Sequence, residues 1–420
     1  MRNNNTKKVK RLSERMLLVT VDVGKVRHTG YLRCPDGSEV KPFDFFNNGG
    51  GFQKLWDCIY HTRKSHHLEE VVVGFESTGP YAEPLLHFLK KKEVKLVQVN
   101  PLHTKRLKEL QGNSPAKTDQ KDPKVIADII ELGHALTVVI PEGVVAELRG
   151  LTQAREKALQ RRTSLLNQLQ DLVFTIFPEF LEVMKDLKSK TSQYLLRHYP
   201  TPEEILEIGL DKLTRILKEV SRGNLNRAKA ERLHSSARDS VGIKEGRYSL
   251  ILDIQECLSL LLHSERFIST VEEEMSQLLK EIPYSRCILS IKGLGEVTVA
   301  GLIGEVGDFR QFHTIPEIIK YAGLDLFEIS SGMRKGQKRI SKRGRSLLRK
   351  LLFFASINTV RKGGIMEEYY QKHIQKGMPK IKALVAVSRK LLRTIFALVR
   401  DNSEFVRDFP EIKPQVKEVA

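Results

Sequence analysis

The chain has 420 residues, of which 40% are hydrophobic and 29% charged. This composition excludes a disordered or fibrous protein and predicts a globular chain of two or three domains. Lys and Arg outnumber Asp and Glu by 70 to 51, and the resulting net charge of +19 predicts a polyanionic partner, most simply a nucleic acid. A ribosome-associated or merely soluble basic protein would share that charge.

The four cysteines lie far apart and form no C-x-x-C pair, which argues against a zinc site and a disulfide framework. The basic N-terminal segment has an apolar run that is too short for a signal peptide and contains Asp22. No stretch has the length of a transmembrane helix. We therefore expect a cytoplasmic protein without a membrane partner.

Residues 1–15 are expected to form a basic tail, and residues 16–140 an α/β domain. In chain order we expect a strand at 16–24, its hairpin partner at 28–37, a helix at 51–64, a strand at 68–76, a helix at 80–93, a strand at 94–100 and a helix at 101–110. Strands that alternate with helices predict parallel pairing.

Residues 141–285 are expected to form long helices. Leu151, Ala158, Leu165 and Leu172 recur every seven residues, as in a coiled coil. Arg155 and Arg162 fall on the companion positions of that seam. Their stems either extend out of the seam, or the two cations bind a nucleic-acid backbone. Both arginines are therefore candidate nucleic-acid ligands.

A second long helix is expected at about 250–280, so the two helices predict an antiparallel hairpin or a dimerising stalk. The insertion between them, about residues 186–244, is polar and predicted to be helical. Its segment TPEEI begins a helix, because Thr201 supplies an N-cap and Glu204 completes a capping box.

Four carboxylates are candidate metal ligands in the first domain. Asp22 and Glu76 each end a predicted strand, and Asp119 and Asp122 precede a predicted helix. The carboxyl ends of strands in an open α/β sheet form sites at one edge, so these acids can converge. Oxygen-only ligands suit Mg²⁺ or Mn²⁺, and a pair of such ions serves phosphodiester chemistry. Taken singly, each residue is more readily explained as a turn residue or a helix cap.

Residues 286–405 are expected to form a C-terminal helical domain, and residues 406–420 a tail. Gly293 and Gly295 lie in a Gly-Leu-Gly turn before a helix rich in small residues, a pattern similar to helix-hairpin-helix elements. Its backbone N–H groups would bind phosphate, although an ordinary helix–helix turn has the same glycines. Further helices are expected from about Ser346 and over residues 380–401.

The segment 327–350, FEISSGMRKGQKRISKRGRSLLRK, has nine basic side chains and one acid. On its own such a segment is typical of a solvated turn. Its cations would also position a nucleic-acid backbone and offset charge in a phosphoryl transition state. The candidates are Arg334, Lys335, Lys338, Arg339, Lys342 and Arg343.

The ordered motifs TVDVGK, GFESTG and KTDQKD, followed by IKGLGEVTVAGLIGEVGDF, YAGL, SSG and ISKRG, resemble the DEDD-type transposases of the insertion sequence 110 family, including its 1111 subgroup. The resemblance covers both ends and the first long helix, but not the insertion. The chain departs from the family pattern at Pro123 and in lacking a proline after YAGL.

The resemblance implies an RNase H-like, RuvC-like catalytic domain, a coiled-coil stalk and a C-terminal transposase domain. It implies that Asp22, Glu76, Asp119 and Asp122 bind the metal ions and that Ser331 is the catalytic serine, forming a covalent phosphoserine link to DNA. Ser330 and Ser341 are the alternative serines. The expected partners are DNA at the element ends and target, a structured noncoding bridge RNA, and further copies of the chain in dimers and a tetramer.

The predicted function is therefore that of an insertion-sequence transposase or recombinase. Two alternatives stay open. One is a metal-dependent RuvC-like nuclease or junction resolvase, in which the carboxylates cleave with water and Ser331 is only a loop residue. The other is an inactive nucleic-acid-binding relative.

Overall fold

The computed structural model describes residues 15–76, 79–111, 122–328, 336 and 338–406. It contains two compact units, which we describe separately. The first comprises residues 1–142 and 307–403, and the second residues 143–306 and 404–420. This division groups residues 286–306 with the long helices. The boundaries expected from the sequence remain predictions.

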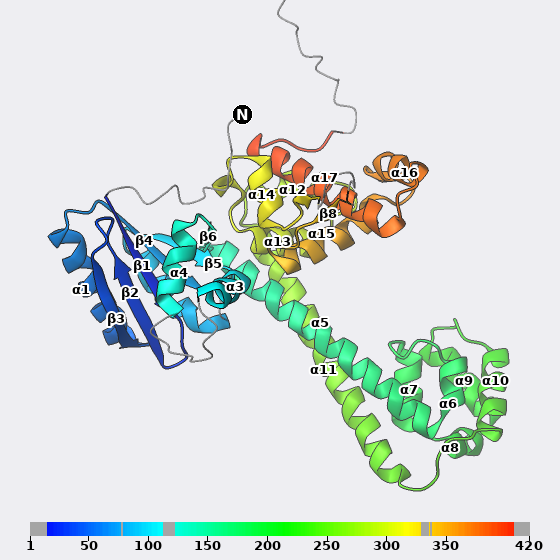
Figure 1. Ribbon diagram of the computed structural model, residues 1–420. Coiled ribbons are helices and arrows are strands. Elements are labelled where there is room, and N and C mark those ends of the chain that lie inside the picture. The colour runs from blue at the N-terminus through cyan, green and yellow to red at the C-terminus, as the bar shows by residue number, and fades with distance from the viewer. Residues whose placement is uncertain (1–14, 77–78, 112–121, 329–335, 337, 407–420) are drawn as a thin grey trace, which may run out of the picture. The chain divides into compact units, whose positions relative to one another are not determined.

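The N-terminal part of the first unit is a mixed α/β domain around a six-stranded sheet, as the sequence predicts in outline (Figure 1). The strand order is β3-β2-β1-β4-β5-β6. The strands are β1 Met16–Asp22, β2 Arg27–Arg33, β3 Glu39–Phe46, β4 Glu70–Glu76, β5 Lys95–Val99 and β6 Ala135–Thr137.

Parallel pairing is confirmed for β1, β4 and β5, while β2, β3 and β6 are antiparallel to their neighbours. The sequence does not predict β3 or β6. The Pro-Asp-Gly sequence at residues 35–37 lies between β2 and β3. β3 escapes prediction because its burial pattern is mostly intermediate or exposed, which leaves no apolar run in the sequence.

Helices cover both faces of the sheet. On one face α1 Gly49–Ser65 and α2 Glu83–Lys90 pack against Leu17, Val19 and Val21 of β1. On the other face α4 Asp122–Glu131 packs against Met16 and Leu18. Alternate residues of one strand therefore belong to different core clusters, as the two-residue period of a strand requires.

α4 lies very close to the sheet. A Cβ atom at Gly74 of β4 would lie 2.1 Å from Cδ1 of Ile130, whose side chain is fully buried. The Thr20 hydroxyl of β1 donates a 2.7 Å hydrogen bond to the carbonyl oxygen of Pro123. The hydrogen bond fixes the first turn of α4 near the end of β1, and the Gly74 contact holds the last turn of α4 against β4.

The second unit is built on two long helices, α5 Gly143–Ile176 and α11 Arg247–Leu279, which pack along each other (Figure 1). They run antiparallel, because Ser264 donates to the carbonyl of Ala158 while Arg155 pairs with Glu272 farther along α11. The fully buried residues of α5 include Leu148, Ala158 and Leu169. Leu151, Leu165 and Leu172 of the predicted seven-residue repeat are only half-buried, and the coiled coil stays a prediction.

The insertion is helical, as predicted. Its helices are α6 Pro178–Val183, α7 Lys190–His198, α8 Pro202–Glu207, α9 Leu210–Val220 and α10 Arg227–Arg238. They share an apolar core with the adjoining ends of α5 and α11. The predicted capping box is confirmed, since Thr201 and Glu204 cap each other reciprocally at the start of α8.

The unit is completed by α12 Ser285–Leu289 and α13 Glu296–Val306. α13 approaches α5 so closely that a Cβ atom at Gly304 would lie 2.7 Å from the backbone carbonyl of Leu148. Arg149 reinforces the contact, because its guanidinium donates to the carbonyl oxygens of Gly304 and Glu305. Only glycine permits this approach of the two helix backbones.

In its described residues, the C-terminal part of the first unit is helical apart from one short pair of strands. It contains η2 Phe309–Gln311, α14 Ile315–Tyr321, β7 Leu326–Phe327, β8 Arg339–Ile340, α15 Ser346–Thr359, α16 Glu367–Gln375 and α17 Lys380–Arg400. The helices predicted from Ser346 and over residues 380–401 are confirmed as α15 and α17. No helix within the described ranges is long and apolar enough to cross a membrane.

We predict that Gly304→Ala destabilises the second unit by about 1–3 kcal/mol, because the added methyl group would collide with the backbone of α5. The matched control is Gly150→Ala, since Gly150 lies on α5 and a methyl group added there would meet nothing within 4 Å. That change should stabilise the helix by about 0.5–1 kcal/mol. Urea unfolding followed by circular dichroism measures both. Equal midpoints for the two variants would contradict the close approach.

Candidate functional site

The candidate site begins with two carboxylates on neighbouring parallel strands. The register of β1 and β4 pairs Val21 with Phe75, so Asp22 and Glu76 are the next residues along each strand. Neighbouring strands lie about 4.8 Å apart, and both side chains are half-buried. The prediction that these acids lie together at the carboxyl ends of two strands is therefore confirmed for the strand positions.

Alternation along the strands sets the face on which the two acids lie. Leu18 and Val72 belong to the core cluster that includes α4. Asp22 and Glu76 each lie four residues farther along and so are on the same face. Their carboxylates are therefore placed on the α4 side of the sheet.

Asp122 is the first residue of α4, and its placement follows from the hydrogen bond between Thr20 and the adjacent Pro123. Thr20 lies two residues before Asp22 on β1. The start of α4 is thereby fixed beside the end of the strand that carries Asp22. The sheet edge thus gathers three of the four predicted carboxylates: Asp22, Glu76 and Asp122.

A lysine already balances this group of acids. Lys108 lies on α3 Pro101–Gln111, and its Nζ is 2.7 Å from Oδ1 of Asp122. The sequence pattern does not single out Lys108, because one lysine on a basic helix carries no spacing signal. Lys108 is recognised as a partner of these acids only when the fold shows that α3 lies beside them.

Burial raises the pKa of the Glu76 carboxyl above its ordinary value. The Asp122 carboxylate raises it further, whereas Lys108 and a hydrogen bond with the buried Thr104 lower it. The net direction is upward, so the protein disfavours the charged form of Glu76 in the absence of a further cation. A divalent cation at this edge would reverse that preference.

The other predicted acid and the preferred serine lie outside the described residues. Asp119 belongs to 112–121, and Ser330, Ser331, Arg334 and Lys335 belong to 329–335. The segment that bears the serine is nevertheless framed by described elements. β7 and β8 pair antiparallel on either side of it, with Leu326 opposite Ile340 and Phe327 opposite Arg339.

Just after β8 the chain is held against the turn that precedes β7. Ser341 donates from its backbone N–H to the carbonyl oxygen of Asp325, and its hydroxyl donates to the Asp325 carboxylate. The Ser341 hydroxyl thus serves as a tie across the base of the basic segment. This is a structural role for one of the two alternative serines.

Two glycines make this base close-packed. A Cβ atom at Gly344 would lie 2.3 Å from the carbonyl oxygen of Tyr321, and one at Gly323 would lie 3.0 Å from the backbone nitrogen of Gly344. Arg349 donates to the carbonyl oxygens of Ala322 and Gly344, which joins the two turns. The motifs YAGL and ISKRG therefore meet in space, and their glycines are required by that contact.

The remaining basic candidates have different surroundings. Lys338 lies 4.0 Å from Glu328, and Lys342 has a left-handed backbone with φ 55°. Arg339 and Arg343 are exposed. All four residues are exposed, so their cations are available to solvent or to a ligand.

The two arginines of the long helix differ from each other. Arg155 forms a 2.6 Å ion pair with Glu272 of α11, which joins the two helices. Arg162 is half-buried, and its Nε has no hydrogen-bond partner within the described ranges. Gly293 and Gly295 lie in the turn between α12 and α13, where Gly293 has a φ of 104°. Their binding roles remain predictions.

A separate group of possible metal ligands lies at the opposite end of the sheet. The ligand atoms of Cys34, Asp36 and His66 lie within 4.8 Å of one another. Cys34 directly follows β2, whose last residues pair with Leu18 near the start of β1. Asp36 accepts hydrogen bonds from the backbone and hydroxyl of Ser38, which explains its orientation without an ion.

We predict that Glu76→Gln stabilises the metal-free protein at neutral pH. Because the pKa of Glu76 is raised, the wild type loses stability as pH rises from the ordinary carboxyl pKa through the raised folded value. The glutamine variant lacks that loss, so its advantage should appear only above the ordinary pKa. Thermal unfolding in EDTA at a series of pH values measures this.

The matched control for that experiment is Glu70→Gln, at the exposed start of the same strand. We expect the control to show no pH-dependent gain. A stability gain for Glu76→Gln that persists at low pH, or that is equalled by the control, would contradict a buried charge at Glu76.

Comparisons with known proteins identify the family. Residues 19–178 match the DEDD model of IS110, described as Transposase, and residues 285–371 match the model described as Transposase IS116/IS110/IS902 family. Together the two matches cover more than half of the chain. The first includes Asp22, Glu76, Asp119 and Asp122, and the second includes Ser331 and the framed basic segment.

Individual relatives agree with these matches. An uncharacterized 43.6 kDa protein of insertion element IS110 from Streptomyces coelicolor is 23% identical, over 93% of this chain and 95% of its own length. A 44.8 kDa protein of IS116 from Streptomyces clavuligerus is 24% identical, over 92% and 95%. The pilin gene-inverting protein of Moraxella lacunata is 29% identical, over 34% and 46%. The chain therefore belongs to the IS110 family of transposases and is an enzyme of the DNA transposase and recombinase class.

Proposed function

We propose that the protein cuts and rejoins DNA strands at the ends of an insertion sequence and at its target, with divalent metal ions on the carboxylates and Ser331 as nucleophile. The observation that carries this proposal is the gathering of Asp22, Glu76 and Asp122 at one sheet edge. The pilin gene-inverting relative supports a DNA rearrangement, because its name describes one.

The residues at this edge fit a hard divalent cation. Carboxylate oxygens are the ligands that Mg²⁺ and Mn²⁺ prefer. The raised pKa of Glu76 is a charge penalty that a bound cation would relieve. Asp22, Glu76 and Asp122 would hold the cation, with Asp119 completing the quartet. Bound there, the cation would supply Lewis-acid polarisation of a DNA phosphate.

A metal ion that binds the Asp122 carboxylate would have to displace Lys108 or share the carboxylate with it. Its ammonium pairs with Asp122 and offsets part of the negative charge of the three acids when no ion is bound. If Asp122 held a metal ion instead, Lys108 would be free to contact a DNA phosphate. We assign it a positioning role of this kind.

In the proposed reaction the Oγ atom of Ser331 attacks the phosphorus of a phosphodiester. One bridging P–O bond breaks, and the departing sugar oxygen takes a proton to become a hydroxyl group. The covalent intermediate is itself a phosphodiester, with one ester bond to Ser331 and one to the retained DNA strand. A sugar hydroxyl of another strand can therefore displace the serine without ATP. Two phosphoester exchanges therefore balance in atoms and charge.

The described surroundings favour Ser331 over Ser341. The Ser341 hydroxyl is held by Asp325 at the base of the framed segment, whereas Ser331 belongs to the Ser-Gly pair within the segment. Arg334, Lys335, Lys338, Arg339, Lys342 and Arg343 would position the DNA backbone and offset transition-state charge.

We further propose that the chain acts as dimers and a tetramer guided by a structured bridge RNA, with α5 and α11 as a coiled-coil stalk. The seven-residue spacing of apolar positions on α5 supports the stalk. The turn at Gly293 and Gly295 before α13 supports a helix-hairpin-helix-like phosphate contact. The net charge of +19 supports two nucleic-acid partners.

We predict that Ser331→Ala abolishes a covalent protein–DNA species that survives SDS denaturation on DNA containing the element ends, with its flanking RNA present. Ser330→Ala and Ser341→Ala are the matched controls, and both should keep the adduct. Mass spectrometry of the trapped peptide identifies the linked residue. DNA cleavage by Ser331→Ala at the wild-type rate, without an adduct, would instead favour a nuclease that uses water.

We predict that Lys108→Met strengthens Mg²⁺ binding by up to about fivefold, because a partly exposed ion pair contributes about 1 kcal/mol at most. Titration calorimetry on the full chain measures the affinity. The matched control is Lys124→Met, which removes a similar ion pair from α4 to Glu39. Weaker Mg²⁺ binding after Lys108→Met, or an equal gain in the control, would contradict competition at Asp122.

A further inference from the structure

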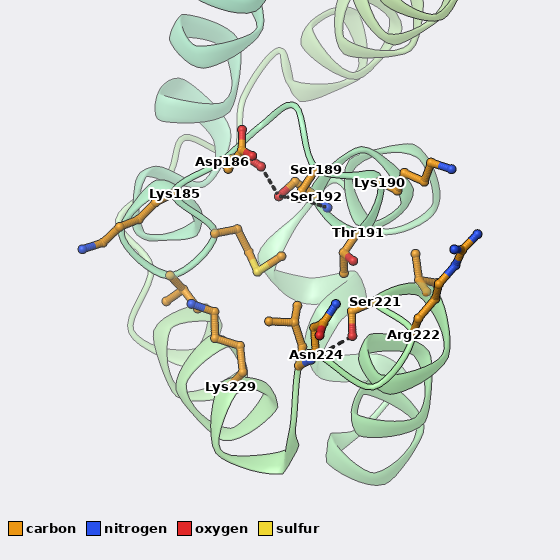
Figure 2. A pocket seen from close by; sticks show the side chains of 14 residues that line it. Lys185, Asp186, Ser189, Lys190, Thr191, Ser192, Ser221, Arg222, Asn224 and Lys229 are labelled. Carbon is orange, nitrogen blue, oxygen red and sulfur yellow. Dashed lines mark hydrogen bonds between the residues drawn. The ribbon is translucent and has the colours of Figure 1, made fainter. Parts of the chain in front are cut away.

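The insertion contains a cavity of about 490 Å³ (Figure 2). It lies between the end of α6, the start of α7, and the turn that joins α9 to α10. We call it the insertion pocket. Its residues fall between the two segments that match the family models, residues 19–178 and 285–371.

The insertion pocket is strongly basic. Four cations line it, and the single acid there is Asp186. The Asp186 carboxylate accepts a hydrogen bond from the backbone N–H of Lys188, so it is engaged in a local turn. Within the described part of the chain, none of the four cations forms an ion pair. These cations are Lys185, Lys190, Arg222 and Lys229.

The cations are held near one another without neutralisation. Burial lowers the pKa of Lys229, and the nearby charges of Arg232 and Lys185 lower it further. In Figure 2 the side chains of Lys185 and Lys229 lie on one side of the insertion pocket, and those of Lys190 and Arg222 extend on the other. An anion beside Lys229 would relieve its repulsion from Lys185 and Arg232.

Neutral hydrogen-bonding groups lie between the cations. Thr191 is 4% exposed, and its hydroxyl makes no hydrogen bond to another described residue. In Figure 2 Thr191 points toward Ser221 and Asn224 across the insertion pocket. The Ser221 oxygen already accepts from the N–H of Leu225, which leaves its proton available as a donor. Such side chains are common partners of phosphate oxygens.

Backbone features at Thr191 and Arg222 also favour an anion in the insertion pocket. Thr191 lies in the first turn of α7, whose N-terminal N–H groups favour a negative charge. Arg222 has a left-handed backbone with φ 55°, a conformation that an arginine adopts only at a cost. A glycine or asparagine would fit there more easily, so the arginine is not explained by the fold of the turn.

The remaining lining is apolar and consists of Val183, Met184, Val220 and Leu225. A cavity with an apolar part and a few convergent polar groups suits a ligand with both characters. A nucleotide has both, since its phosphate is anionic and its base and sugar are largely apolar. Because a paired nucleotide is stacked inside a duplex, only an unpaired one could enter such a cavity.

We propose that the insertion pocket binds a phosphodiester and its unpaired nucleotide in a nucleic-acid strand. The phosphate contacts Lys190, Arg222 and the Thr191 hydroxyl, and the nucleotide lies against the apolar lining. This gives the insertion a binding function beyond the strand exchange proposed above. The site does not depend on Ser331 or on the metal-binding edge.

The test uses two full-length variants. Arg222→Asn with Lys190→Gln removes two cations, and asparagine tolerates the left-handed backbone at position 222. The control is Lys212→Gln with Arg238→Gln, which removes two exposed cations of the same insertion outside the cavity. Fluorescent single strands of RNA and DNA with one sequence are titrated over a series of salt concentrations.

For the pocket variant we expect binding at least about tenfold weaker than wild type, because charge-assisted hydrogen bonds are lost. The slope of log affinity against log salt should fall by about 1.4, or about 0.7 for each lost phosphate contact to a single strand. A loss for RNA alone, or for both strands, supports the proposal and identifies the source of the phosphodiester. The control variant should keep both the wild-type affinity and the wild-type salt slope.

Crosslinking locates the contact independently. A single strand that carries 4-thiouridine should crosslink to peptides that contain residues 184–192 or 220–229, and those crosslinks should disappear in the pocket variant. Ser331→Ala should keep them, which separates this proposal from the serine mechanism. Unchanged crosslinks in the pocket variant, an equal affinity loss in the control, or full competition by inorganic phosphate alone would overturn the proposal.

Discussion

The candidate metal edge depends on the packing of α4 against the sheet. Gly74 provides the space for Ile130, and the hydrogen bond from Thr20 to the carbonyl of Pro123 fixes where the helix begins. If α4 were one turn farther away, about 5.4 Å along its axis, Asp122 could not share a cation with Asp22 and Glu76. The rest of the first unit supports this contact, since α1 and α2 cover the opposite face and keep the strands in register.

Much of this edge is predictable from the sequence. Apolar β-branched runs that end in Asp22 and Glu76 indicate buried strands, and their carboxyl ends must lie together in a parallel pair. Lys108 could not be predicted, because its ion pair depends on how α3 packs rather than on any spacing. β3 and β6 escape prediction for a related reason. β3 is an edge strand without a continuous apolar run, whereas only the first three residues of the short apolar run 135–140 form β6.

The C-terminal segment shows the same division between pattern and packing. Its charge is evident from the sequence, and so are the helices that follow it. The contact of Gly323 with Gly344, and the tie between Ser341 and Asp325, join residues about twenty positions apart and appear only in the fold. They explain why two short motifs accompany the serine: the motifs form the base that frames its segment. The insertion shows the same contrast. Its capping box is local and could be predicted, whereas its pocket is formed by three separate parts of the insertion.

The central claim is that divalent ions bind at the carboxyl ends of β1 and β4. Replacing Mg²⁺ with Fe²⁺ and generating hydroxyl radicals at the bound iron cleaves the backbone beside the metal, and mass spectrometry locates the breaks. We expect breaks next to Asp22, Glu76 and Asp122, which excess Mg²⁺ suppresses. Breaks confined to Cys34, Asp36 and His66, or no localised cleavage, would contradict a metal site at this edge.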